Sequence, residues 1–179
     1  MDYIIEYNMW TSSTSNDDMV HRGKGEDESE VHFTYKSKDK TYHGVEIVHI
    51  TNPLNDRSIS VRAKFDSGAH SSSLDIKVAR ALGVSEGILK KCDELNSIKI
   101  PRTTKLKEQN KIAADIEKGV MNEFEEVTNV KVIRSSTGLT VRIFINLILE
   151  INGNSVITSI NLRDRSGLRT VMLIGLSDM

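Results

Sequence analysis

The stretch Phe65-Asp66-Ser67-Gly68-Ala69 decides how the rest of the sequence is interpreted. Apolar and polar side chains alternate over residues 58–65, which is typical of a β-strand with one buried face. This strand therefore delivers Asp66 directly into a Ser-Gly turn, where the backbone holds the carboxylate at a strand end. Gly68 permits a tight or left-handed backbone there, and Ser67 can hydrogen-bond locally or to a neighbour. An Asp-Ser-Gly tripeptide by itself most often marks a turn, so a structural and a catalytic interpretation both stay open.

Length and composition exclude several classes of protein. The chain has 179 residues and a formal net charge of -1, which leaves room for one domain with an appendage and argues against a basic nucleic-acid or membrane-surface binder. No apolar run approaches the ~20 residues needed to cross a bilayer, and the start lacks the pattern of a signal peptide. Cys92 is the single cysteine, which excludes an intrachain disulfide and a cysteine-based zinc cluster. We expect a soluble protein of the cytoplasm.

The domain is predicted to begin after a polar N-terminal arm. Residues 1–30 have a short apolar start and then a polar, charged composition, typical of a flexible terminus or of an arm that orders against a partner. Residues 31–179 form the predicted domain. Its first paired strands are expected at 31–35 and 45–50, with a loop at 36–40. Later strands are expected at 127–132, 141–151, 155–162 and 170–175, with Asn152-Gly153 as a hairpin turn.

Two helical segments interrupt these strands. Ser72 and Ser73 precede a segment that ends at Gly83, which predicts a short serine-capped helix over about residues 74–83. Residues 85–126 are rich in charge, and apolar residues recur there every four positions. This spacing predicts an amphipathic helix over about residues 106–125, within a helical insertion.

The segment around Asp66 resembles a known active site. Residues 63–75 read Ala-Lys-Phe-Asp-Ser-Gly-Ala-His-Ser-Ser-Ser-Leu-Asp and are similar to the active-site segment of retropepsin-like aspartic proteases. The resemblance is closest to the group named ATP-dependent zinc proteases. Three further blocks follow in the order of the family, at residues 78–84, 132–142 and 162–175. Together the matching parts cover about residues 57–90 and 127–176.

The resemblance implies both a fold and a chemistry. The implied fold is mainly β, a single-lobe acid-protease barrel with a helical insertion at about 85–126 and an N-terminal extension. The implied reaction is peptide-bond hydrolysis by two aspartates that share a proton and activate water. Because the chain offers one matching segment, two copies of Asp66 from a homodimer are expected to form the pair. The implied catalytic residues are Asp66, Ser67 and Gly68, the substrate-lining candidates are Ala69, His70 and Ser71, and the loop-supporting residues are Leu173, Ile174 and Gly175.

The sequence also departs from the family. After the apolar-apolar-Gly signature the family continues with arginine and a helix, whereas residues 176–179 read Leu-Ser-Asp-Met. The insertion and the N-terminal arm are additional. These departures favour an alternative function, a non-catalytic structural or interaction module of a larger assembly such as a virus particle. The expected partners are a second copy of the chain and a peptide substrate or an assembly partner, in the cytoplasm or a viral assembly. No nucleic-acid or membrane partner is expected.

No cofactor or metal is expected. The sequence lacks a Gly-rich phosphate loop ending in Gly-Lys-Ser/Thr and a His-Glu-x-x-His zinc motif, so the sequence supports neither ATP nor zinc. His32 and His49 lie on predicted strands and are interpreted as hydrogen-bonded structural residues. Asp164 lies between two arginines and is interpreted as a salt-bridged structural acid. The basic residues within 99–111 are predicted to form a solvated helical face, with a phosphate or acidic-partner contact as the alternative.

Overall fold

The computed structural model of the chain describes residues 35–37, 40–42, 44–136 and 138–178. The predicted arm at 1–30 lies outside these residues. The strands are β1 (Tyr35–Ser37), β2 (Lys40–Tyr42), β3 (Val45–Thr51), β4 (Ser58–Phe65), β5 (Ser73–Asp75), β6 (Val127–Ser135), β7 (Gly138–Ile151), β8 (Asn154–Arg163) and β9 (Met172–Ile174). The helices are α1 (Ile76–Ala81), α2 (Glu86–Asn96), α3 (Leu106–Glu123) and the 3-10 helix η2 (Leu176–Asp178).

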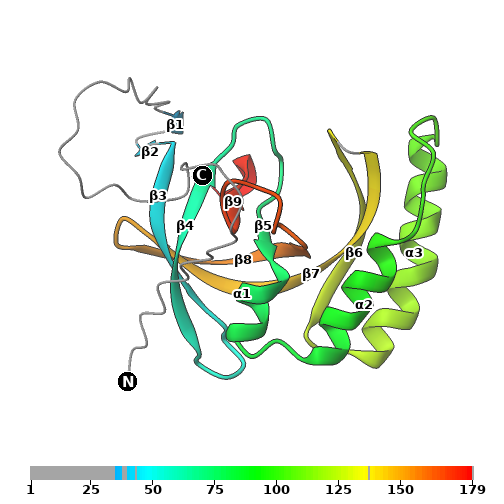
Figure 1. The fold of residues 1–179 in the computed structure, drawn as a ribbon, viewed down its shortest axis with the longest axis horizontal. Coiled ribbons are helices and arrows are strands. Elements are labelled where there is room, and N and C mark those ends of the chain that lie inside the picture. Colours follow the sequence, from blue (N-terminus) through cyan, green and yellow to red (C-terminus); the bar gives the residue numbers. More distant parts are fainter. Residues whose placement is uncertain (1–34, 38–39, 43, 137, 179) are drawn as a thin grey trace.

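The main sheet closes on itself. Its strand order is β3-β4-β9-β5-β8-β7-β6, and an additional pairing between β3 and β7 joins the two ends of the first six strands into a barrel. Strand β6 continues the sheet beyond β7, outside the closed ring. Helices α2 and α3 lie together on the β6 side of the molecule, and β3 lies on the opposite side (Figure 1). The expectation of a mainly β barrel with added helices is confirmed.

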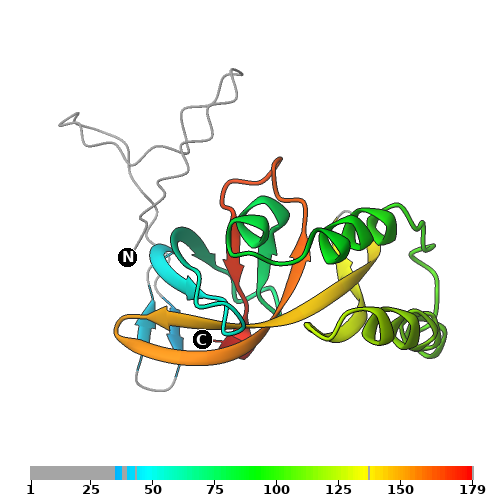
Figure 2. The same ribbon diagram turned by 90° about the horizontal axis from the view of Figure 1, so that it is seen from below.

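The alternating pattern that predicts β4 has the expected physical cause. Ile59, Val61, Ala63 and Phe65 are buried, and the residues between them are more exposed. The long hairpin of β7 and β8 runs from the helices on one side of the molecule to β3 on the other (Figure 2). Its turn is Asn152-Gly153, with φ values of 51° and 75°. This left-handed pair suits the twist of a two-residue hairpin, so the predicted turn is confirmed.

The first strands differ in part from the sequence prediction. Strand β3 pairs with β4, and at its far end with β7, because Val48 and Ile50 belong to the barrel interior. The predicted loop at 36–40 contains the facing ends of β1 and β2, which pair with each other. Residues 31–34 lie outside the described part of the chain.

The start of α1 also differs from the prediction. The N-cap is Asp75, whose carboxylate Oδ1 accepts a hydrogen bond from the backbone N–H of Lys77 at 2.8 Å. Ser72 and Ser73 do not cap the helix because both side chains are buried and bonded to distant parts of the chain. Ser73 instead begins β5, which lies between β8 and β9.

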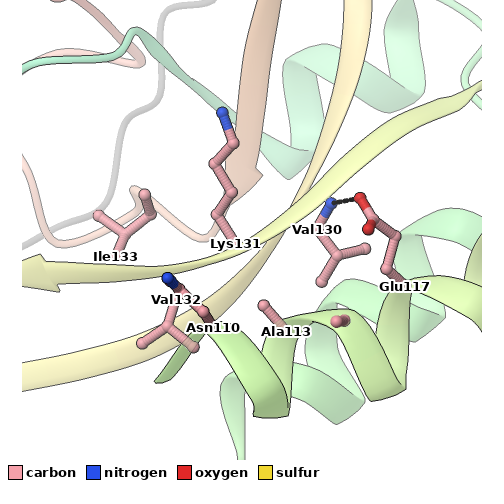
Figure 3. A pocket seen from close by; sticks show the side chains of 8 residues that line it. Asn110, Ala113, Glu117, Val130, Lys131, Val132 and Ile133 are labelled. Carbon is pink, nitrogen blue, oxygen red and sulfur yellow. Dashed lines mark hydrogen bonds between the residues drawn. The ribbon is translucent and has the colours of Figure 1, made fainter. Parts of the chain in front are cut away.

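The connection between α2 and α3 contacts the tip of the β6–β7 hairpin. The guanidinium of Arg102 donates to the backbone oxygen of Ser136 at 2.5 Å, and Ile100 forms an isolated β-bridge with Leu139. Helix α3 spans 106–123, so the predicted amphipathic helix is confirmed. It packs along β6 and leaves a cavity of about 290 Å³ between them (Figure 3). In this cavity the Glu117 carboxylate accepts from the backbone N–H of Val130 at 3.1 Å.

A pair of substitutions on the long hairpin tests this account of the barrel. Leu149 is fully buried, and Ile157 is 64% exposed. We expect Leu149→Ala to lower the free energy of unfolding by about 2–5 kcal/mol, because it removes buried methyl groups and leaves a cavity. We expect Ile157→Ala to change it by less than about 1 kcal/mol. Urea unfolding of both variants checks this, and equal losses would contradict the assigned inside and outside faces.

Candidate active site

Asp66 lies where β4 leaves the barrel. Phe65 before it is fully buried, and the Asp66 backbone N–H donates to the backbone oxygen of Ile174 at 2.9 Å. The carboxylate Oδ1 accepts from the N–H of Gly68 at 2.9 Å, and the N–H of Ala69 donates to the Asp66 backbone oxygen at 3.0 Å. The side chain is half-buried. The sheet therefore fixes the backbone of this acid, and the local turn fixes its side chain.

Strand β9 and the residues after it lie against the loop that follows Asp66. A Cβ atom at Gly175 would lie 2.6 Å from the carbonyl carbon of Ser71 and 2.8 Å from that of His70, closer than real Cβ contacts. The N–H of Leu176 donates to the backbone oxygen of Ala69 at 2.9 Å. The N–H of Ser177 donates to the backbone oxygen of His70 at 3.0 Å. The glycine is required here because two backbones are in direct contact.

Of the two conformations that the sequence suggests at Gly68, tight or left-handed, the structure has the tight turn. Among the described glycines, positive φ values occur at Gly83, Gly138 and Gly153, so Gly68 does not use a left-handed conformation. A Cβ atom at Gly68 would lie 3.1 Å from Oδ1 of Asp66. The glycine therefore leaves room for the Asp66 carboxylate to approach the backbone.

The structure brings the predicted site residues into one loop and the strand beside it. Ser67, Gly68 and His70 are exposed, and Ala69 and Ser71 are half-buried. In β9, Ile174 is fully buried and pairs in parallel with Phe65, while Leu173 pairs with Lys64. The exposed residues form a surface that another molecule can contact.

A second acid, Asp178, is bonded close to this loop. Its carboxylate Oδ2 accepts from the hydroxyl of Ser72 at 2.5 Å, and Oδ1 accepts from the hydroxyl of Thr158. The Ser72 hydroxyl in turn accepts from the N–H of Gly175 at 3.0 Å. The carboxylate thus joins η2, β8 and the end of the loop.

A third acid, Asp75, is buried at the end of β5. Its Oδ2 accepts from the backbone N–H of Arg165 at 2.7 Å. The Arg165 guanidinium donates to the hydroxyl of Ser73 at 2.6 Å and to the backbone oxygen of Thr170 at 3.0 Å. Burial lowers the pKa of Arg165 to about 10, and Arg163 lowers it too, while Asp75 and Asp66 raise it. Arg165 is therefore charged at neutral pH and lies within electrostatic range of Asp66.

Another buried arginine adds to this charge. Arg142 donates to the side-chain oxygens of Asn161 at 3.0 Å and Thr140 at 3.1 Å. Burial lowers its pKa to about 10, and the nearby charges of Arg163 and Arg165 contribute to this lowering. Arg142 therefore lies within electrostatic range of Arg163 and Arg165.

Other side chains correct or confirm the sequence interpretation. Ser166 donates hydrogen bonds to the exposed Asp164 from its side chain and from its backbone N–H, the latter at 2.9 Å, and both lower the pKa of the Asp164 carboxyl. Asp164 therefore belongs to a local turn rather than to a salt bridge with its neighbours. The reason is that the Arg165 side chain points into the interior. His49 Nδ1 lies 3.0 Å from the hydroxyl of Ser60, which confirms a structural histidine, and His32 lies outside the described residues.

The basic residues within 99–111 are exposed, but α3 begins only at Leu106, so they do not share one helical face.

The described residues include no group of three or more His, Cys, Asp or Glu side chains arranged to hold a metal ion. Burial raises the pKa of the Cys92 thiol to about 12, so it is a poor nucleophile at neutral pH. In the same part of the chain, no helix combines the length and apolar character that crossing a bilayer requires.

The hydrogen-bond partners of several residues at this site could not be predicted from the sequence. Asp178 and Ser72 are 106 positions apart, and Asp75 and Arg165 are 90 apart. Local patterns cannot reveal such pairs. The one hint was that Ser72, Asp75, Arg142 and Arg165 all occur inside segments that resemble the family.

Two glycines test the contact beneath the loop. We expect Gly175→Ala to lower the free energy of unfolding by more than about 2 kcal/mol or to displace the loop, because the added methyl group meets backbone atoms. A Cβ atom added at Gly119 in α3 would meet no atom within 4 Å, so Gly119→Ala is the control and should stabilise by about 0.5–1 kcal/mol. Thermal unfolding measures both, and a harmless Gly175→Ala would contradict the contact.

Comparisons with known proteins identify the family of the chain. The family model described as RimB-like, retropepsin-like aspartic endopeptidase RimB, matches residues 49–179, well over half of the chain. A search of curated proteins gave no match. Among solved structures, a protein of unknown function from Legionella pneumophila subsp. pneumophila str. Philadelphia 1 is 14% identical, with a TM-score of 0.32, over 74% of this chain and 81% of that one. The family match confirms the retropepsin-like fold class. The chain therefore belongs to the RimB-like family of retropepsin-like aspartic endopeptidases.

Proposed function

We propose that this protein is an aspartic endopeptidase that works as a homodimer, with one Asp66 from each copy forming the catalytic pair. The observation that carries the proposal is the position of Asp66. It stands half-buried at the end of a buried strand, in a turn held by backbone hydrogen bonds to β9. Such rigid support suits a carboxylate that must bind water in a defined geometry.

The other acids around the loop support the need for a second copy. The carboxylate of Asp75 accepts from two backbone N–H groups, that of Asp164 from Ser166, and that of Asp178 from two hydroxyls. Each of these three carboxylates already accepts hydrogen bonds from other residues of the same chain. Asp66 uses one carboxylate oxygen for the N–H of Gly68. The partner acid that the chemistry requires would therefore come from a second copy of the chain.

The proposed reaction needs one proton shared between the two carboxyls. Two carboxylates about 3 Å apart cannot both ionise, so the pair holds one proton and titrates as a unit. The ionised carboxylate takes a proton from a bound water as the water oxygen attacks the peptide carbonyl. The protonated carboxyl donates its proton to the carbonyl oxygen. Collapse of the tetrahedral intermediate breaks the C–N bond. The leaving amine takes a proton from the protonated carboxyl, and one hydroxyl of the intermediate gives its proton to the other carboxylate as the new carbonyl forms, so the pair again holds one proton.

In this proposal Ser67 would hydrogen-bond across the pair, and Ala69, His70 and Ser71 would line the substrate site. The exposure of Ser67 and His70 is consistent with these roles. Closer kinship to the group named ATP-dependent zinc proteases stays a prediction, as does a place in the cytoplasm or in a viral assembly. The alternative function is a non-catalytic module of a larger assembly. In that case the Asp66 carboxylates of two copies would not come together as a pair.

Asp66→Asn is the first test. We expect it to lower peptide cleavage by about 10²–10⁴-fold, because an amide can neither accept the proton of water nor share one. The control is Asp115→Asn, on the exposed part of α3, which should keep full activity. Cleavage of a peptide library between about pH 3 and 8 should show a maximum at mildly acidic pH, where one proton is shared. Cleavage that survives Asp66→Asn would contradict the proposal, and no cleavage by the wild type would favour the non-catalytic alternative.

Mixing the wild-type protein with Asp66→Asn tests the shared pair. If each subunit contributes one acid, only the wild-type homodimers are active in an equal mixture whose subunits exchange freely. These homodimers are about one quarter of all dimers. If each chain has a complete site, about one half of the activity of an all-wild-type sample remains. Activity and sedimentation are measured on the same samples. Full activity of the monomeric protein would contradict the proposed homodimer.

A further inference from the structure

We propose that Asp178 is a positioning residue, which fixes the Asp66 loop through the hydroxyl of Ser72 and the backbone N–H of Gly175. This inference rests on the proposed function, since it assigns a second acid to the same site. Asp178 does not touch the reacting atoms in this proposal. Its role is to hold the loop, so that the two Asp66 carboxylates meet in a reactive geometry.

The hydrogen bonds around Asp178 form a directed chain. Ser72 is fully buried, and its hydroxyl accepts from the N–H of Gly175, so its single proton is free to be donated to Oδ2 of Asp178 at 2.5 Å. The hydroxyl of Thr158 donates to Oδ1. A hydroxyl has one proton to donate, and both hydroxyls donate it to this carboxylate. The ionised carboxylate, which can only accept, is the group that satisfies both donors.

The chain of bonds ends at the catalytic loop. Gly175 packs against the backbone of His70 and Ser71, and the N–H of Ser177 donates to the backbone oxygen of His70. The backbone oxygen of Ser72 accepts from Asn161, through the backbone N–H at 3.1 Å and the side chain at 2.5 Å. The end of the loop is thus attached to β8, β9 and η2. Asp178 is the charged group that links the Ser72 hydroxyl to the hydroxyl of Thr158 in β8.

The chemistry of the carboxylate distinguishes its two simple replacements. Asparagine keeps one oxygen and can accept from one hydroxyl, while its NH₂ group can only donate to the other. Asp178→Asn therefore keeps part of the attachment, and Asp178→Ala removes it. A misplaced reacting group costs rate rather than ground-state binding, so we expect the loss in kcat rather than in KM.

Peptide cleavage by the full chain provides the first test. We expect Asp178→Ala to lower kcat by about 10- to 100-fold with little change in KM, and Asp178→Asn to lower it less. Ser72→Ala combined with Asp178→Ala should be no worse than the poorer single variant, because both act on one chain of bonds. Asp115→Ala is the matched control. Wild-type kcat in Asp178→Ala would overturn the proposal, as would a loss of activity that only follows a loss of dimer by sedimentation.

Hydrogen exchange provides the second test and needs no activity. In Asp178→Ala the amides of Gly68, Ala69 and Gly175 should exchange faster, while those of β7 and β8 keep their wild-type rates. Unchanged exchange at the loop, or faster exchange throughout the barrel, would overturn a positioning role. If the wild-type protein cleaves no peptide, the proposed protease fails and the exchange result alone decides on the attachment. If Asp66→Asn abolishes cleavage and Asp178→Ala does not, the positioning role alone fails.

Discussion

The close approach of Gly175 to the backbone of His70 and Ser71 is the constraint on which the site depends. Because backbone meets backbone there, no side chain can yield, and the loop and the end of β9 must hold one relative position. The parallel pairing of Phe65 with Ile174 sets the other end of the loop. Asp66 is therefore fixed at two points, one before the turn and one after it. Any change in the barrel that moves β9 also moves the acid.

Two buried arginines are hydrogen-bonded to β5 and β8, and their burial has two opposite effects on stability. Arg142 and Arg165 are nearly inaccessible to solvent, and taking a guanidinium out of water costs free energy. Hydrogen bonds to Asn161, Ser73 and the Thr170 carbonyl compensate for part of this cost. Such an arrangement stabilises little beyond an apolar core, but it specifies one geometry because each donor has one suitable acceptor.

Sequence reasoning succeeded where structure follows from local periodicity. The alternation in β4, the Asn152-Gly153 turn and the spacing in α3 each result from a neighbour relation within a few residues. It failed where a side chain that fits a local motif instead forms a hydrogen bond with a residue far away in the sequence. Ser72 and Ser73 have the pattern of helix caps, but their hydroxyls bond to Asp178, Gly175 and Arg165, and the helix begins later. The sequence around Asp178 does not indicate its role, because its partners come from β8 and from the far end of the loop.

The cover on strand β6 has a consequence for self-association. This strand ends the sheet, and its outer N–H and C=O groups could accept a strand from another molecule. Helix α3 packs along it, and the Glu117 carboxylate already takes the N–H of Val130. A second copy cannot extend the sheet at that point without displacing a charged side chain. The bond to Glu117 thus disfavours open-ended growth into fibres by strand addition at this point of β6.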